Sequence, residues 1–331
     1  MPLAWTAFFV GAIISLTTSW FLVTRLERLG ERIGLSEALL GMVAALAADA
    51  PEITSSVTAV IHHQRTIGAG VVIGSNVFNL AALLGLGAVV SGYVVLHRRV
   101  VLLGGAVALW VALAACLTMT GVVAVPVGLA LVGTALAIYG VVLGLRRAQL
   151  HRLPLPRRAA TWLAVAVHEE EVELELAIRP PRGRPVDAVV ALVSLVVVVS
   201  ASAVMEVAAS RLGHHFHVAD AVTGGVDLAI VTSLPNAVAA LYLAQRGRGA
   251  AALSTALNSN NLNVLAGLLV PGVIVGVAAP SLTGNITALW YLGLTLAVLA
   301  LAYASRGLRR WQGALVIGAY LAYVAVLVGV A

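Results

Sequence analysis

Two carboxylic acids and a proline stand together in a part of the chain that is otherwise apolar. Asp49, Pro51 and Glu52 belong to the stretch ADAPEITSS, and the residues at 39–47 read LLGMVAALA. A carboxylate near the centre of a lipid bilayer costs about 2.5–3.5 kcal/mol on insertion scales. A proline inside a helix removes one backbone hydrogen bond and clashes with the preceding turn. Two costly features so close together indicate a functional site.

The composition of the chain is that of an integral membrane protein. Of its 331 residues, 61% are hydrophobic and 10% are charged, and the mean hydropathy is +1.02. Soluble domains carry about 25% charged residues, so this chain cannot cover itself with polar side chains. The net charge of +6 comes from arginine alone and does not indicate a nucleic-acid partner, because its meaning lies in where the arginines sit. The single cysteine, Cys116, excludes an intrachain disulfide and is interpreted as a packing residue.

Ten segments are apolar and long enough to cross a bilayer, which takes about 20 residues each. If all ten cross, every arginine except Arg65 and Arg211 lies on the same side of the membrane. By the positive-inside rule this side is cytoplasmic, so we expect a multi-pass protein of the plasma (inner) membrane with both termini outside. The predicted spans are 3–23, 36–61, 67–93, 99–119, 121–145, 187–209, 219–245, 250–278, 284–304 and 311–330.

A cytoplasmic loop at 146–186 divides the chain into two halves of five spans each, 1–145 and 187–331. The loop contains an acidic run at 169–175, which could bind a regulatory cation. Nothing in this run matches the spacing of a calcium-binding loop, so we favour a solvated helix face.

The two halves contain an internal repeat at an offset of 184 residues. The first copy, at about 36–85, falls without a gap on the second, at about 220–269. An odd number of spans per half makes the second copy enter the membrane from the opposite side, and such inverted repeats are common in secondary transporters. We therefore expect an all-α membrane protein whose second and seventh spans are broken at Pro51 and Pro235. The coinciding polar pairs are Ser75 with Ser259, Asn76 with Asn260 and Asn79 with Asn263.

At these positions the sequence resembles the sodium/calcium exchanger family, within the wider calcium:cation antiporters. The two α-repeats of that family carry a GTSxPE-like motif in one helix and GSNxxN or GSNxxD in the next. Here the first repeat reads AADAPE at 47–52 and GSNVFN at 74–79, and the second, degenerate repeat reads VTSLPN at 231–236 and NSNNLN at 258–263. The resemblance implies ten helices in two inverted five-helix repeats and transport by alternating access.

The resemblance also implies a set of ion ligands, matched position by position. Glu52 matches the first ion-binding glutamate of the family, and Asn79 matches the asparagine of the first repeat. Carbonyl groups near Ala45 and Ala229 would complete the set. The remaining matches are the hydroxyl residues Ser75, Thr232, Ser233 and Ser259.

This sequence departs from the family pattern at three places. Asn236 replaces the second glutamate, Asn263 stands where many members have aspartate, and Ala48–Asp49 replaces a Thr-Ser pair. The usual acid pair, one from each half, has become Asp49 and Glu52 from the first half. Two carboxylates match the charge of Ca²⁺, and they could also share a proton because ionised neighbours repel each other. With these departures, Asp49, Asn236 and Asn263 join the candidate metal ligands.

Several other polar residues have two readings. Asp227 could be an auxiliary ion or proton site, or a buried residue bonded to a neighbouring helix. Glu206 could line the ion pathway, or pair with Arg211 at the membrane interface. Gly70 and Gly74 have the spacing that lets membrane helices approach closely, here the spans at 36–61 and 67–93.

The function that these observations favour is secondary cation antiport, with Na⁺/Ca²⁺ exchange by alternating access. The transported ions would be Ca²⁺ and Na⁺ or H⁺, with no resident cofactor and no partners beyond inorganic cations and the bilayer. One alternative is a proton-coupled exchanger of Ca²⁺ or another cation, and another is a membrane protein that binds an ion without transporting it. An enzyme is disfavoured because no nucleophile–base constellation and no cofactor loop is present in the sequence.

Overall fold

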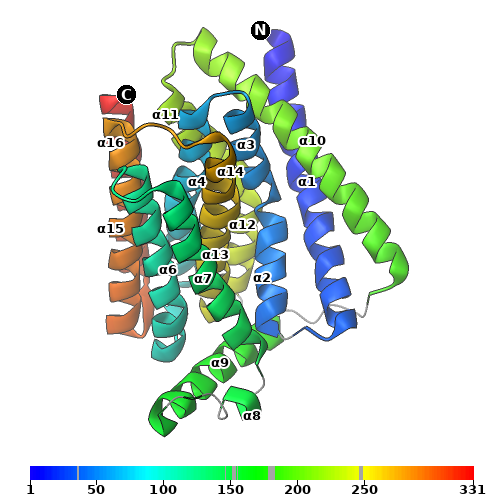
Figure 1. Cartoon of the computed structure of the whole chain (residues 1–331), viewed down its shortest axis with the longest axis vertical. Helices are drawn as coiled ribbons and strands as arrows, with labels where there is room; N and C mark the ends of the chain where they lie inside the picture. Colours follow the sequence, from blue (N-terminus) through cyan, green and yellow to red (C-terminus); the bar gives the residue numbers. More distant parts are fainter. Residues whose placement is uncertain (36, 146, 151–153, 155, 178–182, 246–248) are drawn as a thin grey trace.

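The chain is almost entirely helical, as its composition predicts (Figure 1). The structure is a computed structural model that describes every residue except 36, 146, 151–153, 155, 178–182 and 246–248. The first half comprises α1 (Pro2–Ile33), α2 (Glu37–Ala48), α3 (Ala50–Ile61), α4 (Arg65–Asn79), the π-helical η1 (Leu80–Leu86), α5 (Gly87–Ser91), β1 (Tyr93–Val95), α6 (Arg98–Met119), α7 (Val125–Gly144), α8 (Arg147–Leu150) and α9 (Arg157–Ala177). The second half comprises α10 (Pro185–His215), α11 (Asp220–Val222), the π-helical η2 (Thr223–Leu228), α12 (Ala229–Gln245), α13 (Gly249–Leu262), the π-helical η3 (Asn263–Leu269), α14 (Val270–Val275), α15 (Leu282–Ser305), β2 (Gly307–Arg309) and α16 (Arg310–Val330).

Eight helical segments of the described chain are long and apolar enough to cross a membrane. Among them, α1 and α10 extend well beyond the predicted spans 3–23 and 187–209. The other two predicted spans, 36–61 and 250–278, are present as shorter elements in series: α2 followed by α3, and α13 followed by η3 and α14. The all-α polytopic class is thus confirmed, while the count of ten spans stays a prediction.

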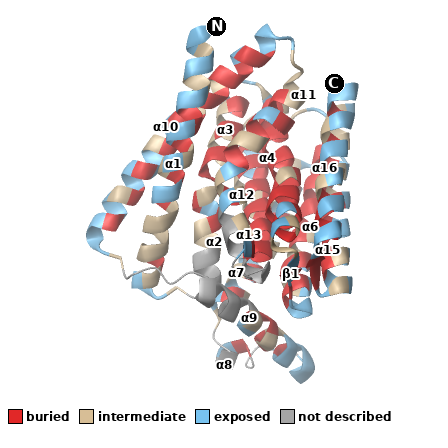
Figure 2. Ribbon diagram, turned by 180° about the vertical axis from the view of Figure 1, so that it is seen from behind, coloured by how far each residue is buried: buried red, intermediate tan, exposed pale blue. Residues whose placement is uncertain are grey.

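Apolar side chains cover the outside of the bundle. Large residues such as Trp20 and Phe21 of α1 and Leu192 and Val193 of α10 are exposed, and the buried residues gather on the inner helices (Figure 2). On a soluble protein, exposed apolar side chains along whole helices would cause association. In a bilayer the same side chains face lipid. Many polar residues are instead buried in the interior of the bundle, among them Asp49, Glu52, Asn76 and Asn79.

Helices α1 and α10 lie side by side on one flank of the bundle (Figure 1). Their midpoints are joined by a hydrogen bond of 2.7 Å between the hydroxyl groups of Ser15 and Ser202. Near the start of α10, the carboxylate of Asp187 lies 2.7 Å from the guanidinium of Arg25 in α1. The two helices are therefore bonded to each other at two separate levels.

The repeat found in the sequence is visible as two-fold related structure. The π-helical turn η1 follows Asn79, and η3 begins at Asn263, its counterpart at the offset of 184. The side-chain amides of Asn76 and Asn260 each donate to the backbone carbonyl of the other, both at 3.0 Å. A reciprocal bond of this kind is expected where a local two-fold axis passes between two equivalent residues.

The predicted helix breaks are only half present. The second span is interrupted at Asp49, where α2 ends and α3 begins, with Pro51 in the first turn of α3. Pro235, by contrast, lies inside the continuous helix α12, so no break is found there. One proline removes only one N–H donor, and a packed membrane helix tolerates that loss when its neighbours satisfy the freed carbonyl. The irregular turn of this span is η2, upstream of the proline.

The close approach that the glycine spacing predicts occurs, but with a different partner. Gly70 and Gly74 of α4 pack against Gly224 and Gly225 of η2, and a Cβ atom on Gly74 would lie 2.6 Å from the Cα of Gly225. The predicted partner, α3, approaches α4 at Gly68 instead. Glycines on both sides let the two backbones touch.

Both termini lie at one end of the bundle, and α8 and α9 lie at the other (Figure 1). We call these the terminal end and the loop end. At the loop end, β1 and β2 form a short antiparallel pair that joins the two halves. Glu169, the first residue of the predicted acidic run, forms an ion pair of 2.6 Å with Arg99, and the side chains of the rest of the run lie outside the described residues.

Candidate cation site

The two acids of the first half meet hydroxyl and amide groups of the second half in the middle of the bundle. Asp49 and Glu52 are both fully buried. The Oδ1 atom of Asp49 accepts hydrogen bonds from the Asn236 amide at 2.7 Å and from the Ser259 hydroxyl at 2.5 Å. The Oε1 atom of Glu52 accepts one from the Ser233 hydroxyl at 2.8 Å. The site is therefore formed jointly by α2–α3, α12 and α13.

Asn236 links the two carboxylates. Its amide nitrogen lies 2.7 Å from an oxygen of Asp49 and 3.4 Å from an oxygen of Glu52. An amide can donate to two carboxylates, whereas a third carboxylate at this position would repel both. The two departures from the family pattern, the acid at 49 and the amide at 236, are thus in direct contact.

Asn79 extends this group of side chains toward the two-fold axis. Its amide donates to the hydroxyl of Ser259 at 3.3 Å and to the side-chain carbonyl of Asn260 at 3.1 Å. Asn263 donates to the side-chain carbonyl of Asn76 at 3.3 Å. Asn76 and Asn260 thus bridge the predicted ligands, a role that the sequence signalled only by their coincidence in the repeat.

Five side-chain oxygens around this network are buried and have no hydrogen-bond partner among the described residues. A buried polar atom without a partner loses about 1–3 kcal/mol relative to a solvated one. Hard cations such as Ca²⁺ bind six to eight such oxygens at once. The five are Asp49 Oδ2, Glu52 Oε2, Asn79 Oδ1, Asn236 Oδ1 and Asn263 Oδ1, and together they suit an oxygen-ligated cation.

The remaining predicted residues lie at different distances from this network. The Ser75 hydroxyl donates to the carbonyl of Ala229 at 3.4 Å, so these two predicted ligands lie together. The Thr232 hydroxyl donates to the carbonyl of Leu228, the last residue of η2, at 2.9 Å. The carbonyl of Ala45 accepts the backbone N–H of Asp49. Asp227 is exposed on η2 and forms no hydrogen bond with the network.

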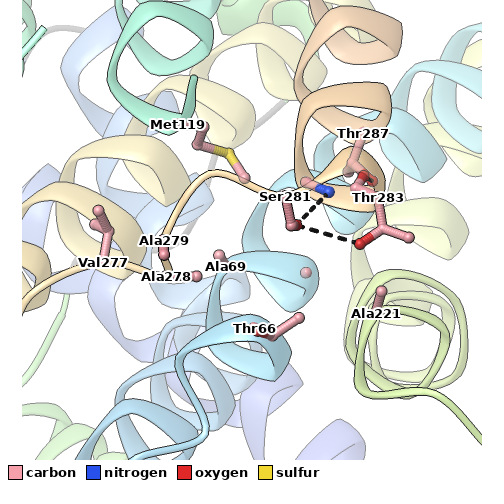
Figure 3. A pocket seen from close by; sticks show the side chains of 12 residues that line it. Thr66, Ala69, Met119, Ala221, Val277, Ala278, Ala279, Ser281, Thr283 and Thr287 are labelled. Carbon is pink, nitrogen blue, oxygen red and sulfur yellow. Dashed lines mark hydrogen bonds between the residues drawn. The ribbon is translucent and has the colours of Figure 1, made fainter. Parts of the chain in front are cut away.

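A separate small cavity of about 30 Å³ lies at the terminal end, between α4 and the start of α15 (Figure 3). It has room for one or two water molecules. Thr66 lines it from α4, and Ser281 caps α15 by accepting the N–H of Gly284 at 3.1 Å. None of the five unpaired oxygens lines this cavity, so it is not the cation site.

Comparisons with known proteins identify a family, a curated relative and solved structures of similar fold. The chain matches the family model described as sodium/calcium exchanger protein over residues 3–146 and 186–329. It is 26% identical over 277 residues to the inner membrane protein YrbG of Escherichia coli (strain K12), covering 83% of this chain and 81% of that protein.

Two solved structures share the fold. One is the sodium-calcium exchanger NCX_Mj, with a TM-score of 0.60 and 23% identity over 98% of each chain. The other is the H⁺/Ca²⁺ exchanger CAX, with a TM-score of 0.71 and 12% identity over 99% of this chain and 86% of that one.

Proposed function

The chain belongs to the sodium/calcium exchanger protein family, and on this premise we propose that it is a secondary antiporter that exchanges Ca²⁺ for Na⁺ by alternating access. The observation that carries the proposal is the set of five buried, unpaired oxygens around Asp49 and Glu52. Two carboxylates balance the charge of one Ca²⁺ or of two Na⁺. A site of this charge can therefore hold either ion in turn.

Each side chain of the site has a role in this proposal. Asp49 and Glu52 supply the charge, and Asn79, Asn236 and Asn263 supply neutral amide oxygens. Ion binding would replace donors that now occupy the carboxylates, such as the amide of Asn236. The neutral ligands that complete the proposed site are the hydroxyls of Ser75, Thr232, Ser233 and Ser259 and the carbonyl of Ala229.

We also propose that the terminal end faces the outside and the loop end faces the cytoplasm. The support is the placement of arginine, since residues of the loop end such as Arg99, Arg306 and Arg310 belong to the arginine-rich side. Helices α1 and α10 would then move as one body over the ion-binding core. Their bonds at Ser15–Ser202 and Arg25–Asp187 hold them to each other.

Proton-coupled Ca²⁺ exchange is the second candidate, and one feature of the site favours it. Both carboxylates come from one helix break, and the second half contributes only neutral groups. Two close carboxylates readily share one proton, so a proton could replace Na⁺ as the counter-ion. The fold shared with the H⁺/Ca²⁺ exchanger CAX is compatible with this candidate.

The deciding experiment is ⁴⁵Ca²⁺ uptake into proteoliposomes loaded with Na⁺ and diluted into Na⁺-free buffer. We expect uptake that requires the Na⁺ gradient and is lost in Glu52→Gln, because the variant lacks one of the two charges. Glu31→Gln is the matched control, since Glu31 lies near the loop end of α1, outside the network. Uptake driven by a pH gradient instead would select the proton-coupled candidate. Stabilisation by Ca²⁺ on heating with no flux under either gradient would contradict transport altogether.

A further inference from the structure

Glu206 is a second buried acid that the proposed cation site does not use. It lies on α10, its exposed fraction is 0%, and neither carboxylate oxygen has a hydrogen-bond partner among the described residues. The predicted pairing with Arg211 is wrong, because Arg211 is exposed and forms no ion pair with it. An unpaired carboxylate buried in a membrane protein is costly when ionised, and such residues mark proton or ion pathways.

Among the described residues, one titratable side chain lies within ion-pair distance of Glu206. The Nδ1 atom of His62, at the end of α3, lies 3.8 Å from the Oε2 atom of Glu206, and the His62 side chain is 51% exposed. One turn further along α10, Ser210 accepts a hydrogen bond of 2.5 Å from Gln64, in the turn between α3 and α4. The acid is therefore buried, while the imidazole beside it reaches the surface at the terminal end.

The other charged groups on elements packed against α10 are directed elsewhere. The charged residues of α1 lie at its loop end, and those of α3 are Glu52, which is bonded within the cation site, and His62. Asp227 of η2 is exposed, and Asp220 of α11 lies 3.7 Å from His214. Within the part of the chain that the structure describes, His62 is the one basic side chain within ion-pair distance of Glu206.

Other buried polar groups lie on the same two helices as this acid and His62. Along α10 the buried residues Ser202, Glu206 and Ser210 recur every four positions and so share one helix face. On α3, one turn beyond Glu52, the hydroxyl of Ser55 is buried and has no hydrogen-bond partner in the described chain. Helices α3 and α10 pack against each other, and His62 and Glu206 meet between them.

We propose that Glu206 is a proton-binding residue in the terminal-end half of the pathway, and that His62 exchanges its proton with the solvent. A proton passes from water to the imidazole of His62 and from there to the carboxylate of Glu206, and it returns by the same route. At 3.8 Å the transfer proceeds through a small rotation of the exposed imidazole or through one bridging water. Neutral Glu206 lets α10 move against α3 without carrying a bare charge through the membrane.

This proposal rests on the proposed antiport and adds to it a dependence on the pH at the terminal end. We expect Ca²⁺ exchange by the wild type to change at least about fivefold between about pH 5 and pH 8 on that side, because proton occupancy of one site varies by up to about tenfold per pH unit. In Glu206→Gln, which mimics the protonated acid, this dependence should fall below about twofold. His62→Asn should shift the profile, and Glu206→Asp should retain a profile.

The test measures ⁴⁵Ca²⁺ exchange in proteoliposomes while the internal and the external pH are varied separately. His63→Asn is the matched control, because His63 is the neighbouring histidine and has a positive φ of 61°, which asparagine adopts readily. A pH profile of Glu206→Gln equal to that of the wild type would overturn the proposal. If Glu206→Gln does not fold, an unchanged profile of His62→Asn would do the same.

A second measurement keeps this inference separate from the proposed function. Infrared difference spectra of the purified protein report the protonated-carboxyl band as the pH is changed, whether or not transport occurs. We expect a titrating band in Asp49→Asn/Glu52→Gln that is lost when Glu206→Gln is added to that double variant, because Asp49 and Glu52 can themselves share a proton. A band that persists unchanged in the triple variant would overturn the proton site, whereas absent flux in the wild type with the expected band would overturn only the antiport.

Discussion

The contact between Asp49 and Asn236 predicts that the acid and the amide can be swapped between these two positions in a double variant, whereas either single substitution impairs the site. The amide nitrogen of Asn236 lies 2.7 Å from Oδ1 of Asp49, so Asn236→Asp alone would place a third carboxylate against the existing pair. Two charges about 4 Å apart repel by about 1 kcal/mol in water and about 4 kcal/mol at an effective dielectric constant of about 20. We expect this variant to be destabilised within that range or to bind a proton in compensation.

Asp49→Asn alone should weaken Ca²⁺ binding. It removes one of the two charges that would balance Ca²⁺. The attraction between one carboxylate charge and a cation about 4 Å away is about 1–4 kcal/mol per unit charge of the cation, so the affinity should fall by at least about fivefold. The double variant Asp49→Asn/Asn236→Asp restores two carboxylates, now one from each half. Its Ca²⁺ affinity should return to within about tenfold of the wild type, since the repulsion is absent.

The assay is a double-mutant cycle read by Ca²⁺-dependent thermal stability of the purified protein and by ⁴⁵Ca²⁺ uptake. The coupling energy between the two positions should be about 1–3 kcal/mol and favourable in the double variant. Independent sites add to within about 0.5 kcal/mol. If the change in Ca²⁺ binding free energy of the double variant equals the sum of the changes in the two single variants, the compensation between positions 49 and 236 is refuted.

Two further predictions concern the framework around the site. Gly74→Ala would press a methyl group against Gly225 and should lower the free energy of unfolding by about 1–3 kcal/mol, measured by thermal melting in detergent. Gly133→Ala is the control: nothing lies within 4 Å of the added atom, and it should not lower the free energy of unfolding, because alanine favours the helix over glycine. Ser15→Cys/Ser202→Cys, made in a cysteine-free background, should form a disulfide between α1 and α10 because the hydroxyl groups are 2.7 Å apart, and it should leave ⁴⁵Ca²⁺ uptake intact if the two helices move as one body. Loss of uptake on oxidation, restored by a reductant, would show that α1 and α10 move relative to each other.

Much of the fold follows from local properties of the sequence. Long apolar runs form helices because a bilayer leaves no other way to satisfy their backbone groups, and this alone predicts the all-α polytopic class. The interruption at Asp49–Pro51 is also local, since proline starts a helix more readily than it continues one. Pro235 has the same residue type in an equivalent position, yet α12 continues through it. Whether a helix breaks at Pro235 depends on contacts with the neighbouring helices, which the helix propensities of single residues do not describe.

The sequence by itself determined which residues belong to the candidate site, because a carboxylate, an amide or a hydroxyl in an apolar span is rare and the offset of 184 residues pairs most of them. Only the tertiary structure decided how they meet: that Asn236 bridges Asp49 and Glu52, that Gly74 packs on Gly225 rather than on α3, and that His62 faces Glu206. Each of these contacts joins residues more than 140 positions apart. Such contacts arise from the packing of whole helices, whose relative rotation and depth no local pattern of residues specifies.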